Sequence, residues 1–294
     1  MSGLSDYSAQ ANLNWLTGNR AMPALASRYM ALFTTAPTSD AGTGGTEVSG
    51  SGYARVQVAG AIAAAASFTT ASTTITMSVN NPGWVVAGMN VYDATVGAQI
   101  GTVSSWSASS TTLTLTAVAG SSSSGATDSL VFSAWPASSA SSGTEPRTAP
   151  ANVTNNATIT FPQATGTGWG TVTSWGLYDA LTGGNFVVWD YLGNYKWSPF
   201  TCTLASPGVL TCTDQSFSNG QYAVVTTKYG GTLPTTGGSW AGILTVAGAS
   251  GATFNLGVNT TSTGDGQVRQ VIQQPIPQNV VALFNPSNQT LTSA

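Results

Sequence analysis

The sequence predicts an all-β protein with one short helix at its N-terminus. Short runs of strand-forming residues recur along the 294 residues, and clusters of Gly, Pro, Asn and Ser separate them. Only one segment has the pattern of a helix. The composition also changes at about Ala61, shortly before the first of two compact, strand-rich segments.

The predicted helix lies at the N-terminus. Ser5 or Asp6 can cap its first turn, and Gly18 is a suitable residue to end it. A helix of about a dozen residues is too short to be stable alone. Its apolar end, Trp15 and Leu16, is therefore expected to pack on the sheet or on a neighbouring subunit, and both residues are candidate assembly contacts.

Residues 29–33 and 53–58 are predicted to be the first two strands of the core. The residues between them are mostly Thr, Ser, Gly, Pro and Asp, which is typical of a long polar loop. Glu47 lies in this loop, within the sequence Gly-Thr-Glu-Val-Ser-Gly. It is assigned to loop geometry or to a subunit contact rather than to catalysis.

Further strands follow in three groups and one final strand, and a Ser/Pro/Gly-rich connector at 136–148 separates the first group from the second. Residues 112–116 alternate strictly between Thr and Leu, as in a half-buried strand. The expected strands are 74–79, 84–92, 99–105, 111–117 and 129–132, then 157–161, 171–178 and 186–189, then 209–213, 222–228, 243–246, 253–258 and 268–273, and finally 280–284.

Two aspartates occur in matching Tyr-Asp-Ala…Gly sequences, Asp93 and Asp179. Both could be ligands of a common metal or sugar. The favoured interpretation is that each closes an Asx turn ahead of a glycine.

The two cysteines, Cys202 and Cys212, lie on either side of a predicted hairpin. If Pro207 is the centre of a three-residue loop, the cysteines are directly opposite and could form a disulfide. If Pro207 and Gly208 form a two-residue loop, Cys212 faces Thr203 and the cysteines are only diagonal. A protein made in the cytoplasm usually keeps its thiols reduced.

The chain carries very little charge. Only 6% of its residues are Asp, Glu, Lys or Arg, against about 25% in an ordinary soluble domain. The net charge of −3 argues against binding to nucleic acid or to an anionic membrane. The longest apolar run, 59–66, is too short to span a membrane, and no secretory signal is recognised. An uncharged polar surface suits packing within an assembly, although a soluble monomer is the alternative.

The residues needed for common catalytic sites are scarce. The chain has no histidine, which excludes Ser-His-Asp catalysis and His-ligated zinc, and it has no phosphate-binding loop. A glycosidase needs two carboxylates, and the two glutamates, Glu47 and Glu145, lie in polar loops. Asp179, Asp190 and Asp214 are the alternative acids. No catalytic residue, metal site or cofactor is therefore predicted, and a polysaccharide depolymerase is the third functional hypothesis.

Aromatic residues support a second hypothesis, which is glycan binding. Tyr191, Tyr195 and Trp197 lie close together near a Gly-Asn turn and are candidates for stacking against sugar rings. Trp175 and Tyr178 lie in predicted strands and are better assigned to the core or to contacts between subunits.

Several sequence motifs together resemble a family of bacteriophage structural proteins, described as tail-fibre-like or minor virion proteins. The motifs are Leu4-Ser5-Asp6-Tyr7, Ala31-Leu32-Phe33-Thr34-Thr35-Ala36-Pro37-Thr38, Gly44-Gly45-Thr46-Glu47-Val48-Ser49-Gly50, Gly52-Tyr53-Ala54-Arg55, Ile159-Thr160-Phe161-Pro162, Gly168-Trp169-Gly170-Thr171 and Gly176-Leu177-Tyr178-Asp179-Ala180. They occur in this order along the chain. The resemblance implies a non-enzymatic particle component without a cofactor.

The chain departs from the short family pattern by two insertions, which resemble β modules of phage fibre proteins. The expected fold is therefore a discontinuous, jelly-roll-like β-sandwich with a short N-terminal helix and two inserted small β modules. The core comprises 1–65, 135–195 and 273–294, and the modules comprise 66–134 and 196–272.

The resulting functional hypothesis is a structural protein exposed on a phage virion, either in a tail fibre or minor tail structure or as a head decoration or head fibre. It would be assembled in the host cytoplasm, bind other virion proteins and form a homotrimer, the trimer resting on the resemblance. It would bind no nucleic acid and insert into no membrane. A glycan-binding receptor protein is the alternative.

Overall fold

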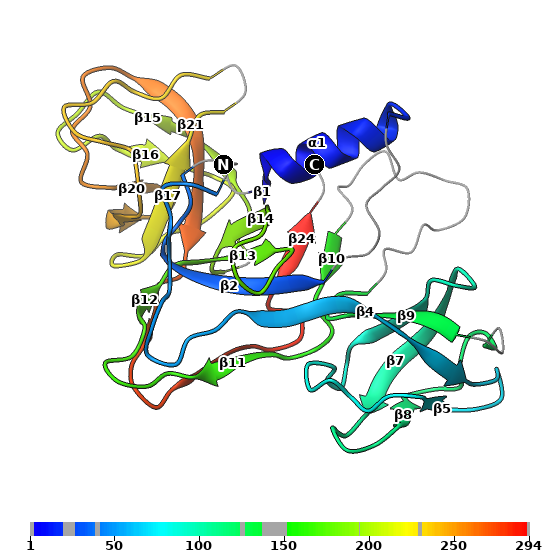
Figure 1. Cartoon of the computed structure of the whole chain (residues 1–294). Coiled ribbons are helices and arrows are strands. Elements are labelled where there is room, and N and C mark those ends of the chain that lie inside the picture. Colours follow the sequence, from blue (N-terminus) through cyan, green and yellow to red (C-terminus); the bar gives the residue numbers. More distant parts are fainter. Residues whose placement is uncertain are drawn as a thin grey trace.

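The computed structural model describes residues 3–19, 27–38, 42–123, 127–136, 152–193, 195–228 and 231–292. Within these ranges it contains one helix, α1 (Asp6–Leu16), and otherwise strands in antiparallel sheets, which confirms the predicted all-β sandwich class (Figure 1). The predicted connector at 136–148 lies outside the described residues except for Pro136.

The sandwich core is assembled from strands that are distant in sequence. These strands are β1 (Gly3–Leu4), β2 (Arg28–Thr35), β3 (Thr46–Glu47), β4 (Val56–Ser67), β10 (Asn152–Thr154), β11 (Ile159–Gln163), β12 (Gly170–Val172), β13 (Ser174–Tyr178), β14 (Phe186–Tyr191), β22 (Gln274–Ile276), β23 (Val281–Phe284) and β24 (Thr290–Thr292).

One layer of the core has the order β1-β14-β13-β2-β4, with β3 paired to β2. Three two-stranded ladders accompany it, β10–β24, β11–β23 and β12–β22. Side chains from both parts meet in one apolar cluster that includes Met30, Leu32, Phe161, Trp169 and Trp175. Their burial supplies most of the driving force for joining these segments.

The opposite face of β2, β13 and β14 carries a second cluster with Phe33, Phe186 and Trp189. The rings of Phe33 and Phe186 meet edge to face with centroids 6.1 Å apart. Gly176 lies beneath them, and a Cβ there would be 2.7 Å from Cε2 of Phe186. Only glycine therefore lets these rings pack directly on β13.

The first strand-rich segment closes into a barrel. Its strands are β5 (Thr74–Met77), β6 (Asn90–Asp93), β7 (Ala98–Ser105), β8 (Thr112–Leu115) and β9 (Thr127–Ser133). Together with β4 they pair in the cycle β4-β5-β8-β7-β6-β9-β4. The twelve-residue β4 pairs with β2 through its first residues and with β9 and β5 through the rest. The core layer and the barrel are therefore parts of one hydrogen-bonded sheet.

The expected alternation in the barrel is confirmed, because Leu113 and Leu115 are buried and Thr112 is exposed. The expected strand at 84–92 is correct only for its last residues. The Asn81 side chain donates hydrogen bonds to the carbonyl oxygens of Val85 and Trp106, at 2.8 and 2.6 Å. These bonds hold the preceding segment as a loop.

The second strand-rich segment forms a separate seven-stranded sheet. Its strands are β15 (Ser198–Cys202), β16 (Leu210–Thr211), β17 (Tyr222–Thr226), β18 (Leu244–Thr245), β19 (Ala247–Ser250), β20 (Thr253–Asn255) and β21 (Gly264–Val271), in the order β18-β17-β21-β15-β16-β20-β19. Phe200, Leu210, Phe254 and Val268 lie in its own apolar cluster. Figure 1 shows this sheet and the barrel on opposite sides of the sandwich core.

The two proposed registers of the cysteine hairpin are both wrong. Cys202 pairs with Leu210, so Cys212 lies two residues beyond the partner of Cys202. Both thiols are buried and free, and no disulfide joins them. Their residues belong to the apolar cluster of the seven-stranded sheet.

The helix has the predicted caps. Ser5 Oγ accepts a hydrogen bond from the Ser8 amide at 3.2 Å, and Gly18 has a φ of 71° just after the last turn. No residue of α1 is buried, and Trp15 and Leu16 are 51% and 70% exposed. Much of their apolar surface is therefore open to a neighbouring subunit, and their role as assembly contacts stays a prediction.

Candidate functional site

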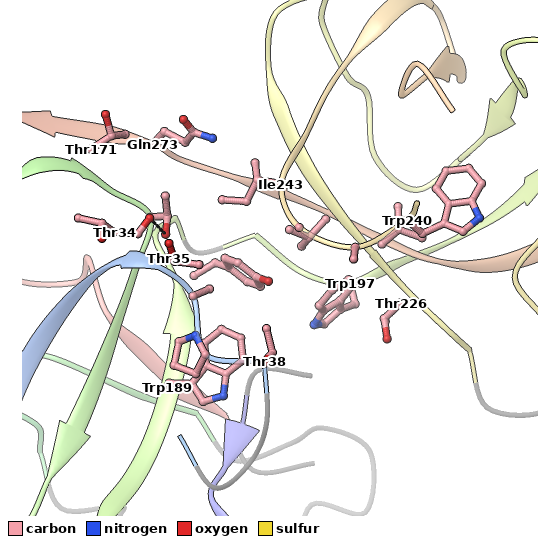
Figure 2. Close-up of a pocket in the computed structure, with 18 residues that line it drawn as sticks. Thr34, Thr35, Thr38, Thr171, Trp189, Trp197, Thr226, Trp240, Ile243 and Gln273 are labelled. Carbon is pink, nitrogen blue, oxygen red and sulfur yellow. Dashed lines mark hydrogen bonds between the residues drawn. The ribbon is translucent and has the colours of Figure 1, made fainter. Parts of the chain in front are cut away.

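The main candidate site is a cleft between the sandwich core and the seven-stranded sheet (Figure 2). Its volume is about 430 Å³, and 18 residues line it. They come from the end of β2 and the following loop, from β12 to β14, from the segment before β15, from β17, from the segment before β18, and from the residues after β21. Among these residues there is no Asp, Glu, Lys or Arg.

Trp189 and Tyr191 form the wall on the core side. They are two residues apart on β14 and therefore share one face of the strand. Their ring centroids are 5.2 Å apart at an interplanar angle of 67°. Burial is the main cause that raises the pKa of the Tyr191 phenol, so its hydroxyl stays protonated at neutral pH and can donate a hydrogen bond.

Trp189 is buried, and its indole N–H donor is not used. Its side chain is only 2% exposed, and its indole N–H has no hydrogen-bond acceptor in the described part of the protein. A buried polar group without a partner is costly, and such groups are uncommon. The nitrogen itself is enclosed by protein atoms.

Trp197 and Trp240 belong to the opposite wall, with Thr226 of β17 beside them. Trp240 is held in place by its indole N–H, which donates to the Pro234 carbonyl at 3.0 Å. Trp197 is half-buried, and Figure 2 shows it and Trp189 on the two sides of the cleft.

An ion pair joins the two walls next to the cleft. Arg269 of β21 contacts both carboxylate oxygens of Asp190 on β14, with 2.9 Å between Nη2 and Oδ2. The same Nη2 donates to the Gly193 carbonyl at 3.0 Å. The Arg269 side chain is only 5% exposed. This bidentate contact links the seven-stranded sheet to the core beside the cleft.

Two of the three residues expected to stack on sugars, Tyr191 and Trp197, line the cleft. Tyr195 does not. Its ring covers Gly193, where an added Cβ would be 2.8 Å from Cε2 of Tyr195. Trp189 also lines the cleft but is not among the residues selected from the sequence for stacking, although the alternation Trp189-Asp190-Tyr191 places both rings on one face of a strand.

Three of the five acidic residues considered for catalysis have structural partners. Glu47 pairs with Arg55, and Asp190 pairs with Arg269. Asp179 accepts hydrogen bonds from the backbone amide and the side-chain amide of Asn185, at 2.6 and 2.7 Å. Asp214 is exposed in the seven-stranded unit, and Glu145 lies outside the described residues.

The two matching Tyr-Asp-Ala sequences both form turns, by different bonds. Asp93 Oδ1 accepts from the amides of Thr95 and Val96, at 2.8 and 3.1 Å, which is an Asx turn. Asp179 instead closes the β13–β14 hairpin through Asn185. No group of three or more His, Cys, Asp or Glu residues that could hold a metal occurs in the described ranges.

A second cluster brings together the motifs of the polar loop and the β13–β14 hairpin. Arg55 donates to both carboxylate oxygens of Glu47, at 2.8 Å from Nε and 2.7 Å from Nη2. Its Nη1 donates to the carbonyls of Ala180 and Gly183, at 3.0 and 2.8 Å. Its guanidinium also lies 3.4 Å from the centre of the Tyr178 ring. These contacts give Glu47 a structural role.

Tyr53 extends this cluster into the core. Its hydroxyl accepts from the Leu32 amide at 2.9 Å and donates to Glu47 Oε1 at 3.1 Å. Its ring lies against those of Phe161 and Trp169. The residues of the sequence motifs therefore hold distant segments of the sandwich together.

A family model described as Gp80, the podophage GP4 fiber I protein gp80, matches two overlapping stretches of the chain, residues 3–118 and 110–197. The match includes the barrel and ends where the seven-stranded sheet begins. No curated protein matches the chain significantly. Among the described residues no helix has the length and apolar character needed to cross a membrane.

Proposed function

The chain belongs to the family of the podophage GP4 fiber I protein gp80, and we propose that it is a non-enzymatic fibre subunit exposed on the virion and acting through packing. The match over most of the chain carries this proposal. The structure supports it because the motif residues, including Glu47 and Arg55, form buried packing and hydrogen-bonding contacts.

The proposed organisation has a discontinuous core of 1–65, 135–195 and 273–294, with modules at 66–134 and 196–272. The second module is supported by an apolar cluster of its own in the seven-stranded sheet. The first module is supported by the closed pairing of its strands, although its buried residues share one apolar cluster with the core. Because the family match includes the barrel but not the second module, we propose that residues 196–272 are the addition particular to this chain.

Assembly with other virion proteins is proposed to use the N-terminal helix. Leu13, Trp15 and Leu16 are 61%, 51% and 70% exposed, which is unusual for three large apolar residues so close together. The helix is tied to the core by Ser8, whose hydroxyl donates to the Val187 carbonyl at 2.7 Å. A helix held in this way presents its apolar residues to a neighbouring subunit, and a homotrimer is the proposed arrangement.

The proposed role is tested on the particle itself. Quantitative mass spectrometry of purified virions should find the protein in a fixed copy number, and an electron-microscopy map should place it on the outer surface. Its absence from mature particles would overturn the proposal. Light scattering of the purified protein should show trimers, and Trp15→Ser with Leu16→Ser should shift them towards monomers.

The absence of enzymatic activity is tested separately. Incubation of the purified protein with host surface polysaccharides should leave their length unchanged. Cleavage that is lost on substitution of a single acidic residue would refute the non-enzymatic assignment and support a depolymerase.

A further inference from the structure

We propose that the cleft lined by Trp189, Tyr191, Trp197 and Thr226 binds a neutral saccharide. This inference goes beyond the role of a fibre subunit, since it assigns a ligand to a site rather than a place in the particle. It rests on the volume, charge and chemistry of the cleft residues.

The absence of charge in the lining points to a neutral ligand. None of the 18 lining residues carries a charge, and the neighbouring Arg269 and Asp190 neutralise each other in a bidentate pair. An anionic ligand such as a phosphate or a sugar acid would lose its hydration without gaining a cation. The volume of about 430 Å³ lies within the usual range for small-ligand sites.

The chemistry of the lining points to a ligand with both apolar and hydroxyl surfaces. Aromatic rings on both walls offer flat apolar faces, as required to stack on the C–H faces of sugar rings. Six threonines lie among the lining residues. The hydroxyls of Thr34 and Thr38 donate to backbone carbonyls, which leaves their oxygens able to accept from a ligand.

The hydroxyl groups of the lining distinguish a saccharide from a purely apolar ligand. Tyr191 keeps its proton at neutral pH, because burial raises the pKa of its phenol, and its hydroxyl can donate to a sugar oxygen. A hydrocarbon would cover this hydroxyl and those of the lining threonines without offering them a hydrogen bond.

The first experiment measures binding to the isolated chain of 294 residues by calorimetry. The probes are neutral oligosaccharides of glucose, galactose, mannose, rhamnose and N-acetylglucosamine, with uronate-containing and sialylated oligosaccharides for comparison. At least one neutral probe should bind with a Kd of about 1 mM or tighter. Trp197→Ala should weaken this binding about tenfold or more. Leu204→Ala is the control, because it removes an exposed apolar side chain of the seven-stranded unit that does not line the cleft, and it should leave the Kd unchanged.

A second measurement uses only the unmodified protein, so it does not depend on whether a variant folds. In the NMR spectrum of the unmodified protein, the indole N–H signals of Trp189 and Trp197 should shift on adding the bound saccharide, while that of Trp15 should not. The proposal is overturned if no neutral probe binds, if anionic probes bind more tightly than all neutral ones, or if the shifts fall outside the cleft. A peptide from another virion protein that fills the cleft and excludes all saccharides would also overturn it.

Discussion

Truncation of Arg55 should destabilise the sandwich core more than any exposed charge substitution in this protein. The Arg55 side chain is only 9% exposed and makes two hydrogen bonds to Glu47, two to the β13–β14 hairpin and one ring contact with Tyr178. Arg55→Ala leaves the Glu47 carboxylate, 26% exposed, with the Tyr53 hydroxyl as its remaining donor. Loss of one partner of a fully buried pair costs about 3–5 kcal/mol. Since Glu47 is partly hydrated, we expect about 3 kcal/mol.

The assay is a double-mutant cycle with Arg55→Ala, Glu47→Ala and both together. Native-state hydrogen exchange is the suitable readout, because a chain with several structural units need not unfold in one step. Exchange at residues 179–185 should accelerate most in Arg55→Ala, since Arg55 binds two carbonyls of that hairpin. The coupling energy between Arg55 and Glu47 should be about 2 kcal/mol.

The exposed pair Lys228–Asp265 provides the matched control. Its charged atoms are 3.8 Å apart, and the side chains are 46% and 38% exposed. The same cycle on this pair should give about 0.5 kcal/mol or less. A coupling energy for Arg55 and Glu47 that does not exceed the control would refute the structural role assigned to the cluster.

Three further predictions concern the junction, the core and the barrel. Arg269→Ala leaves the Asp190 carboxylate without its ion-pair partner at the junction between the core and the seven-stranded sheet. Hydrogen exchange at residues 190–198 should become faster, corresponding to a local loss of stability of about 3 kcal/mol, while exchange in the barrel should not change. An unaltered exchange rate at the junction would contradict the role of the ion pair. Burial raises the pKa of Tyr53 far above its usual value, so the stability it contributes is complete below about pH 10 and is lost as the pH rises further. The free energy of unfolding of the native protein, measured with urea, should therefore fall above that pH. The Tyr53→Phe variant should show a smaller fall over the same pH range. Leu113→Ala removes a fully buried side chain of the barrel and should lower its stability by about 2–5 kcal/mol. Hydrogen exchange should become faster in β5 and β8 but not in the seven-stranded sheet. Equal acceleration in both would show that the barrel and the seven-stranded sheet unfold together.

Local patterns in the sequence were sufficient for the class of the fold and for several of its elements. Ser5 and Gly18 bound the helix because capping depends on residues within one turn of each other. The alternation that buries Leu113 and Leu115 follows from the two-residue period of a strand. For the candidate site, the sequence indicated Tyr191 and Trp197 through their local density of aromatic residues.

The tertiary structure alone decided how these elements combine. It made β4 a strand of both the core layer and the barrel, and it set Cys202 opposite Leu210. It also placed Tyr195 outside the cleft and Trp189 within it. Such outcomes depend on which distant strands pair and in which register, and a local period does not contain this information.

The polar loop between β2 and β4 shows the same division. From the sequence, Glu47 is a loop carboxylate in a recognisable motif. Its function as the partner of Arg55 depends on the β13–β14 hairpin, whose Ala180 lies 125 positions further along the chain from Arg55. The sequence determined the residue types, and folding determined the contact, because only packing of the sandwich brings the hairpin carbonyls within hydrogen-bonding distance of Arg55.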